Sequence, residues 1–128
     1  MRMLLDTHTF VWFIEDNPRL PPMIRALIED PSNVVLVSIV SVWEIAIKVG
    51  IGKIVLSQPF ETFIPQQLAL NYAALLSVDL RHVLVVAGLP FYHRDPFDRL
   101  IIAQAMVEGL PILSADKVFD LYAVSRLW

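Results

Sequence analysis

The pattern of hydrophobic and polar positions predicts short buried strands that alternate with helices. Apolar runs of strand length occupy residues 1–5, 33–38, 73–78 and 111–114, and residues 122–128 form a candidate fifth strand. Hydrophobic residues at helical spacing occupy residues 7–15, 21–30, 41–53, 59–72, 79–90 and 93–105. Strands that alternate with helices imply right-handed crossovers and a mostly parallel sheet covered on both faces. We therefore expect an α/β protein, a three-layer α/β/α sandwich with a mostly parallel sheet of four to five strands.

Residues with special backbone or capping properties mark several helix ends. Gly50 and Gly52 are expected to end the helix over residues 41–53. Asp79 is the expected N-cap of the helix over residues 79–90, and Gly88 is its expected stop. His82 is expected on the surface of that helix.

The composition is that of a globular chain with surplus hydrophobic surface. No internal repeat or long linker divides the 128 residues, so we expect one domain over residues 1–128. The hydrophobic share of 56% exceeds the roughly 45–50% usual in soluble domains. This surplus indicates a protein partner, and we expect a homodimer because most soluble oligomers are symmetric dimers.

The pattern favours a cytoplasmic protein with no membrane partner. The long uncharged stretches, residues 31–43 and 63–78, are shorter than the ~20 apolar residues of a spanning helix and contain polar side chains. Asp6 interrupts the first apolar run before a secretory signal can develop. The absence of cysteine excludes disulfides and thiolate metal sites and fits a reducing compartment.

The net charge of −3 provides no overall positive field for a nucleic acid. A polyanionic substrate would need local basic residues, and the candidates are Lys48, Lys53, Arg81, Arg94, Arg99 and Lys117. The alternative for each of them is an ordinary surface charge or ion pair, with Lys48 four residues after Glu44 on the same helix.

Four acidic residues are candidates for the carboxyl edge of the predicted sheet. Asp6 ends the first strand, Glu44 lies in the first turns of the helix after the second, and Asp116 comes just after the fourth. Asp98 lies in the first turn of the longest helix, where Asp95 before Pro96 is the expected N-cap. Ligands of such sheets bind outside the carboxyl ends of the strands, so we expect these four acids to converge there.

Converging carboxylates require a compensating charge, because like charges raise one another's pKa. Mg²⁺ or Mn²⁺ fits best, since both are hard cations that prefer oxygen ligands and the chain has no zinc-type ligand pattern. Such a site is suited to phosphodiester hydrolysis. Each acid also has a structural alternative as a helix cap, a dipole partner or half of a surface ion pair.

The order of four motifs along the chain resembles that of the PIN domain, and more closely the VapC-like ribonuclease toxins. The motifs are "LLDTHTFVW", "SVWEIAIKVGIGKI", "HRDPFDRLIIAQA" and "ILSADKVFDLY", and together they span essentially the whole chain. The resemblance implies that Asp6, Glu44 and Asp98 are acidic metal ligands and that Asp116 is the fourth acid. It also implies that Thr7 and Ser114 are small hydroxyl residues that hold a ligand carboxylate or a water.

The function implied by this resemblance is metal-dependent endoribonuclease cleavage of RNA by the toxin of a toxin–antitoxin pair. A cognate antitoxin would occupy the active-site groove, and a homodimer would set two acidic sites side by side. Arg94 or Arg99 would contact phosphate, and the aromatic rings of Trp12, Trp43 and Tyr92 are candidates for stacking on RNA bases. His8 is expected to be a packing residue or one whose tautomer is fixed.

Two other classes of function remain open from the residues alone. A receiver-type phosphoacceptor domain has the same length and layers, but it needs paired acids after its first strand, where this chain has Asp6 alone. A PIN-like module that binds RNA or a partner without catalysis would keep the fold and lack the chemistry.

Overall fold

Five parallel strands form the centre of the molecule, which the computed structural model describes over residues 1–128. The strands are β1 (Arg2–Leu5), β2 (Val34–Ser38), β3 (Ala74–Leu76), β4 (Ile112–Leu113) and β5 (Arg126–Leu127). They lie in the order β3-β2-β1-β4-β5, and every neighbouring pair is parallel. The carboxyl ends of β1, β2 and β4 therefore meet at one edge of the sheet.

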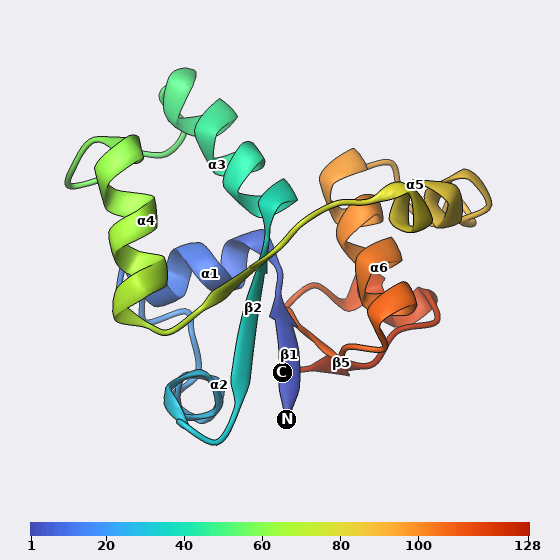
Figure 1. Cartoon of the computed structure of the whole chain (residues 1–128), viewed down its shortest axis with the longest axis horizontal. Helices are drawn as coiled ribbons and strands as arrows, with labels where there is room; N and C mark the ends of the chain where they lie inside the picture. Colours follow the sequence, from blue (N-terminus) through green and yellow to red (C-terminus); the bar gives the residue numbers. More distant parts are fainter.

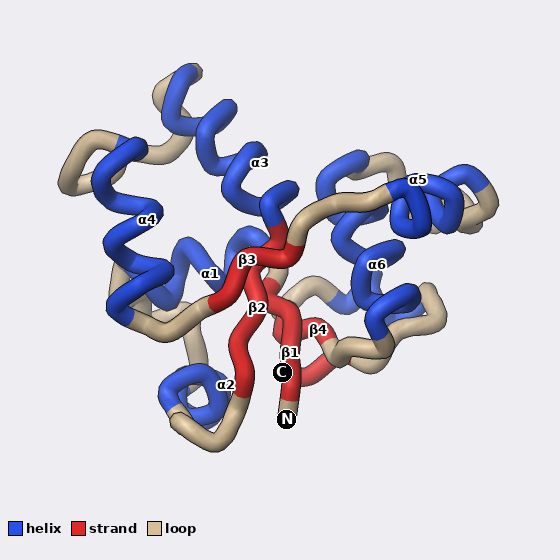
Figure 2. Tube along the Cα trace, in the orientation of Figure 1, coloured by secondary structure: helices blue, strands red, loops and turns tan.

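Helices cover the two faces of this sheet, as Figures 1 and 2 show from one viewpoint. One face carries α1 (Thr7–Ile14), α2 (Pro22–Glu29), α3 (Ile39–Gly50) and α4 (Phe60–Leu70). The other face carries α5 (Leu80–Ala87), α6 (Pro96–Glu108) and the short 3₁₀ helix η1 (Lys117–Leu121), which the sequence pattern does not predict. The expected three-layer sandwich with a parallel sheet is confirmed. None of the helices has both the length and the apolar character that crossing a membrane requires.

Alternating side chains along the strands divide the hydrophobic core between the two faces. In β1, Met3 and Leu5 belong to the cluster packed with α1, α2, α3 and α4. Leu4 points the other way and packs with Ile101 on α6. Because α6 is pressed against the sheet in this way, its first turn has a defined position at the carboxyl edge.

The junction between β2 and α3 contains no loop. Ser38 is the last residue of β2, and its Oγ accepts a hydrogen bond from the N–H of Val40 at 3.0 Å, so the same residue caps α3. The helix thus begins at Ile39, two residues before the predicted start, and it ends at Gly50 as predicted. Glu44 consequently lies one turn away from the sheet edge.

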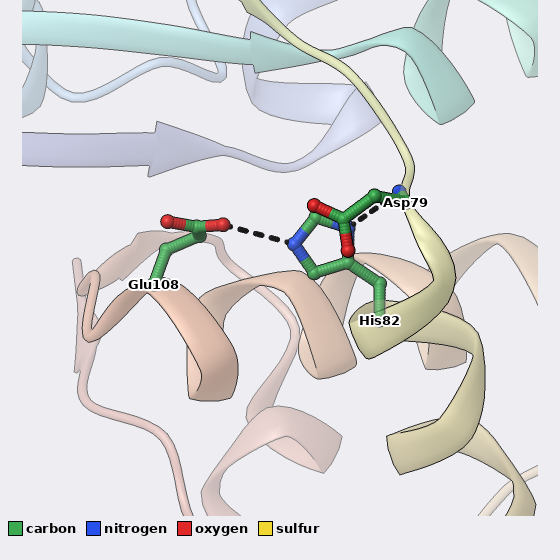
Figure 3. Close-up of side chains that lie close together, drawn as sticks. All are labelled: Asp79, His82 and Glu108. Atoms are coloured by element: carbon green, nitrogen blue, oxygen red, sulfur yellow. Dashed lines mark hydrogen bonds and ion pairs between the residues drawn. The ribbon is translucent and has the colours of Figure 1, made fainter.

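The predicted surface position of His82 on α5 is wrong, because this side chain is fully buried. Asp79 caps α5 as expected, and its N–H donates to His82 Nδ1 at 3.0 Å. The ring proton therefore lies on Nε2, which is 3.0 Å from Glu108 Oε1 on α6 (Figure 3). Donor atoms of these three residues lie within 4.8 Å of one another, but protein hydrogen bonds already engage both ring nitrogens. The group fastens α5 to α6.

Candidate active site

Four acidic residues from separate parts of the chain gather at the carboxyl edge of the sheet and form what we call the acidic cluster: Asp6, Glu44, Asp98 and Asp116. Asp6 follows β1 and Asp116 follows β4, and both line one pocket of about 230 Å³, the acidic pocket. The charges of Asp6, Glu44 and Asp116 all act on the carboxyl of Asp98 and raise its pKa. The parallel order of β2, β1 and β4 explains why these acids meet.

The carboxyl of Asp98 has a strongly raised pKa. Burial is the main cause, the charge of Asp95 adds to it, and the rest of the cluster contributes, so that the pKa of Asp98 rises to about 8. Asp95 itself caps α6 as predicted, because its Oδ1 accepts from the N–H groups of Phe97 and Asp98 at 2.9 and 3.0 Å. Without a cation, the Asp98 carboxyl is therefore mainly protonated at neutral pH.

Asp6 is held by hydrogen bonds on both carboxylate oxygens. The Ser114 hydroxyl donates to Oδ2 at 2.5 Å, and the N–H of Thr9 donates to Oδ1 at 2.8 Å. Burial nevertheless raises the pKa of Asp6 above its usual range, against the lowering effect of these bonds. Ser114 Oγ also accepts the N–H of Asp116 at 3.0 Å, so one hydroxyl links two acids of the cluster.

Thr7 contacts another hydroxyl and not an acid. Its Oγ1 donates to Ser41 Oγ at 2.9 Å, and both residues are buried. The bond joins the first turn of α1 to the first turn of α3. The structure therefore does not place Thr7 in the expected hydrogen bond with a ligand carboxylate, and its position fixes the two helices relative to each other.

Glu44 has one oxygen paired and one oxygen without a partner. Lys48 Nζ donates to Oε2 at 2.7 Å from one turn further along α3. Oε1 is buried and accepts no hydrogen bond. Buried polar atoms nearly always have a partner, so this oxygen marks a place where a ligand is expected. In this arrangement Lys48 neutralises Glu44 and does not extend toward a substrate.

The family model of the PIN domain matches residues 3–125 of the chain. The chain belongs to the PIN domain family. Among curated proteins, Ribonuclease VapC16 of Mycobacterium tuberculosis is 36% identical over 58 residues, which are 45% of this chain and 41% of that protein. The match thus spans less than half of that relative.

Several solved structures have a similar fold. VapBC2 from Rickettsia felis, bound to a promoter DNA fragment, has a TM-score of 0.74 and 15% sequence identity, and the match covers 99% of this chain and 98% of that one. FitAcB from Neisseria gonorrhoeae has a TM-score of 0.68 and 20% identity over 100% and 97% of the two chains. VapBC from Salmonella typhimurium bound to DNA has a TM-score of 0.73 and 15% identity over 99% and 97%. At these identities the likeness establishes a shared fold.

The two arginines of the motif "HRDPFDR" differ in their surroundings. Arg99 is buried, and its guanidinium donates to the backbone oxygens of Leu89 and Pro90 at 3.0 and 2.7 Å and to the hydroxyl of Tyr122 at 3.3 Å. The expectation that Arg99 contacts phosphate is therefore wrong, since its donors are committed inside the protein. Arg94 is exposed. Neither arginine forms an ion pair with the neighbouring aspartates of this PIN domain.

Aromatic side chains line the acidic pocket, and one more is exposed on α3. His8 and Trp12 line the acidic pocket with ring centroids 6.0 Å apart, and Trp128 lies 6.1 Å beyond Trp12. His8 is exposed, so the expectation of a packing residue is wrong. Trp43 on α3 is 58% exposed, and its ring meets the edge of Phe97 at 5.1 Å.

His93 is a site residue to which the sequence pattern assigns no role. Its Nε2 lies 3.4 Å from Asp98 Oδ2, and its Nδ1 lies 2.7 Å from the hydroxyl of Tyr122. The spacing of His93 and Asp98 within "HRDPFDR" is a usable signal for their contact. Tyr122 comes from the segment after η1, and no local pattern links it to His93.

The largest cavity of this PIN domain, about 650 Å³, lies away from the acidic cluster. It is lined by residues around the start of β2 and the end of α4, among them Val35, Leu70 and Tyr72. The acidic pocket, at about 230 Å³, is the smaller of the two.

Proposed function

We propose that this PIN-domain protein is an endoribonuclease that hydrolyses RNA phosphodiester bonds with Mg²⁺ or Mn²⁺ and serves as the toxin of a toxin–antitoxin pair. The observation that carries the proposal is that Asp6, Glu44 and Asp116 lie near enough to the Asp98 carboxyl for their charges to add to the burial that raises its pKa. The similarity to Ribonuclease VapC16 and to the VapBC complexes among the solved structures supports it.

The acidic cluster fits a hard divalent cation. All its donors are carboxylate oxygens, and Glu44 Oε1 is buried without a partner. Asp79, His82 and Glu108 are the only group of three potential ligands whose donor atoms all lie within 4.8 Å of one another. The carboxylates of the acidic cluster therefore lie further apart than this. Repulsion favours this separation, and a bound cation would draw the carboxylates together.

Each residue of the site has a distinct task in the proposed reaction. Ser114 and Thr9 orient the Asp6 carboxyl through hydrogen bonds to both of its oxygens and favour its ionised form. Lys48 occupies Oε2 of Glu44 and leaves Oε1 for the cation. A divalent ion held by these carboxylates would lower the pKa of an attacking water and offset negative charge on the phosphate. The burial of Asp6 and Glu44 limits the competing access of bulk water to these ligands.

RNA would reach the cluster across a surface that offers both charge and aromatic rings. Arg94 is exposed and free to contact phosphate, whereas Lys48 stays paired with Glu44. Trp12 and His8 form a wall of the acidic pocket on which an unstacked base can lie. A substrate with unpaired bases, such as an RNA loop, fits this arrangement best.

Exposed apolar side chains support two protein partners. Four exposed apolar residues recur every four positions along α3 and at its C-cap, and we call them the α3 stripe: Ile39, Trp43, Ile47 and Ile51. A contiguous apolar stripe of this kind is typical of an interface. We assign it to a homodimer, because Glu44 lies on the same helix and two acidic clusters would then lie near each other.

We assign the acidic pocket to the antitoxin. An arginine of an antitoxin segment would pair with the carboxylates of the cluster and exclude the cation, which silences the enzyme. The proposal places the protein in the cytoplasm, where RNA and antitoxin are both available.

The deciding experiment is cleavage of end-labelled structured RNAs by the purified, antitoxin-free protein in Mg²⁺ or Mn²⁺. Asp98→Asn and addition of EDTA should each abolish cleavage. Glu61→Gln is the matched control, because it removes one negative charge at an exposed position of α4. If neither wild type nor Asp98→Asn cleaves RNA although both bind it, the protein is an RNA-binding module without nuclease activity.

A further inference from the structure

A chain of polar contacts leads from a buried arginine to Asp98. Arg99 Nη1 lies 3.3 Å from the Tyr122 hydroxyl, and that hydroxyl lies 2.7 Å from His93 Nδ1. The other ring nitrogen, Nε2, is buried, has no hydrogen-bond partner of good geometry, and faces Asp98 Oδ2 at 3.4 Å. The rings of His93 and Tyr122 also meet edge to face at 5.4 Å, which restricts the rotation of the imidazole.

The donors around the Tyr122 hydroxyl determine the tautomer of His93. The guanidinium of Arg99 and the backbone N–H of His93, both 3.3 Å away, can only donate, so they occupy the two lone pairs of the oxygen. The hydroxyl proton must then point to His93 Nδ1. A proton on Nδ1 would instead place a third donor against the same oxygen. The neutral ring therefore carries its proton on Nε2, directed at Asp98.

We propose that His93, in this Nε2–H form, is a positioning residue that holds Oδ2 of Asp98 and leaves Oδ1 free for the divalent cation, with Tyr122 and Arg99 setting its tautomer. The inference rests on the proposed function in so far as Asp98 is a metal ligand. The separation of 3.4 Å shortens when the acid is ionised and the site is loaded, as contacts in unliganded active sites commonly do.

The arrangement answers a specific difficulty of the acidic cluster. An ionised Asp98 is repelled by Asp6, Glu44 and Asp116, and rotation away from them would destroy the site. A neutral N–H donor fixes the carboxylate without adding a positive charge that competes with the cation. The positive charge of Arg99 does not contact Asp98, because its guanidinium is bound to the carbonyls of Leu89 and Pro90.

The first test is nuclear magnetic resonance of ¹⁵N-labelled histidine in the metal-free protein, at a pH where imidazoles are neutral. We expect His93 to show a bare Nδ1 and a protonated Nε2. Tyr122→Phe, which keeps the ring and removes the hydroxyl, should give a mixture of tautomers. Tyr72→Phe is the matched control, because Tyr72 is 93% exposed and lies at the largest cavity. A wild-type protein with the proton on Nδ1 overturns the proposal.

The second test measures Mn²⁺ affinity by calorimetry in the absence of RNA. His93→Asn keeps an acceptor near Tyr122 but is too short to reach Asp98, and it should weaken binding roughly tenfold. His93→Gln places an amide N–H near the position of Nε2 and should restore most of that loss. Unchanged affinity in a folded His93→Asn variant, or no rescue by His93→Gln, contradicts the proposal.

The two proposals fail in different ways. If wild type binds Mn²⁺, shows the Nε2–H tautomer and depends on His93 for affinity, but cuts no RNA, the positioning role stands and the nuclease function falls. If wild type cuts RNA and His93→Asn does so with unchanged Mn²⁺ affinity and unchanged half-saturation by Mn²⁺, the nuclease stands and the positioning role falls.

Discussion

Ser114 Oγ donates a hydrogen bond of 2.5 Å to Asp6 Oδ2, across 108 residues of chain. The contact exists because β1 and β4 are neighbours, with Leu5 opposite Leu113, so the residues that follow each strand emerge side by side. It lowers the pKa of Asp6 and so offsets part of the larger increase that burial causes.

Removal of this hydroxyl should weaken cation binding. In Ser114→Ala the carboxylate of Asp6 loses a charge-assisted hydrogen bond, its pKa rises further, and we expect roughly tenfold lower Mg²⁺ or Mn²⁺ affinity. Ser114→Thr keeps the hydroxyl and serves as the control. Titration calorimetry of both variants checks the prediction. An equal decrease of cation affinity in Ser114→Ala and Ser114→Thr would show that the packing of residue 114, and not its hydroxyl, controls the affinity.

The stability of the metal-free protein should fall as the pH rises from about 4 to about 8. Native Asp98 releases its proton near pH 8, whereas the unfolded chain releases it near the ordinary value of 3.8. The native state thus binds more protons within this window, so the free energy of unfolding decreases with pH, on the order of a few kcal/mol.

The matched variant for this pH dependence is Asp98→Asn, which cannot ionise at this position. It should be more stable than wild type at pH 8 in EDTA and about equally stable near pH 4. Urea unfolding across the pH range measures both curves, and added Mg²⁺ should reverse the order at pH 8. Parallel curves for the two proteins would contradict the raised pKa.

Arg99 should matter for stability and Arg94 should not. Arg99→Met leaves the buried carbonyls of Leu89 and Pro90 without a donor, and we expect a loss of about 2–4 kcal/mol in the free energy of unfolding. Arg94→Met, at an exposed position, should change it by less than about 0.5 kcal/mol. Urea denaturation of both variants measures the free energy of unfolding. Similar small decreases in the two would show that water replaces Arg99 as the hydrogen-bond donor to these carbonyls.

The α3 stripe should hold two copies of the chain together. Ile47→Glu places a charge in the middle of the stripe and should convert a dimer into a monomer in sedimentation velocity at micromolar concentration. Met23→Glu is the control, because Met23 is 71% exposed on α2, away from the stripe. If wild type is a monomer, or if Ile47→Glu remains a dimer, the α3 stripe is not the homodimer interface.

The sequence by itself determined the layers of the fold and the position of each acid relative to a strand end. Period-two and helical patterns are local, and helix caps such as Asp79 and Asp95 act within a few residues, so both can be read along the chain. Once the strands are parallel, residues that follow them must meet at one edge. This is why Asp6 and Asp116 could be expected at one place.

Only the tertiary structure decided which polar side chains serve the fold and which face the site. Arg99 and His82 look like surface residues in sequence, yet packing of the segment before α6 and of α5 against α6 buries them. The contact of Tyr122 with His93 depends on where the chain passes after η1. Burial and hydrogen-bond partners arise from segments that are distant in sequence, and no local periodicity records them.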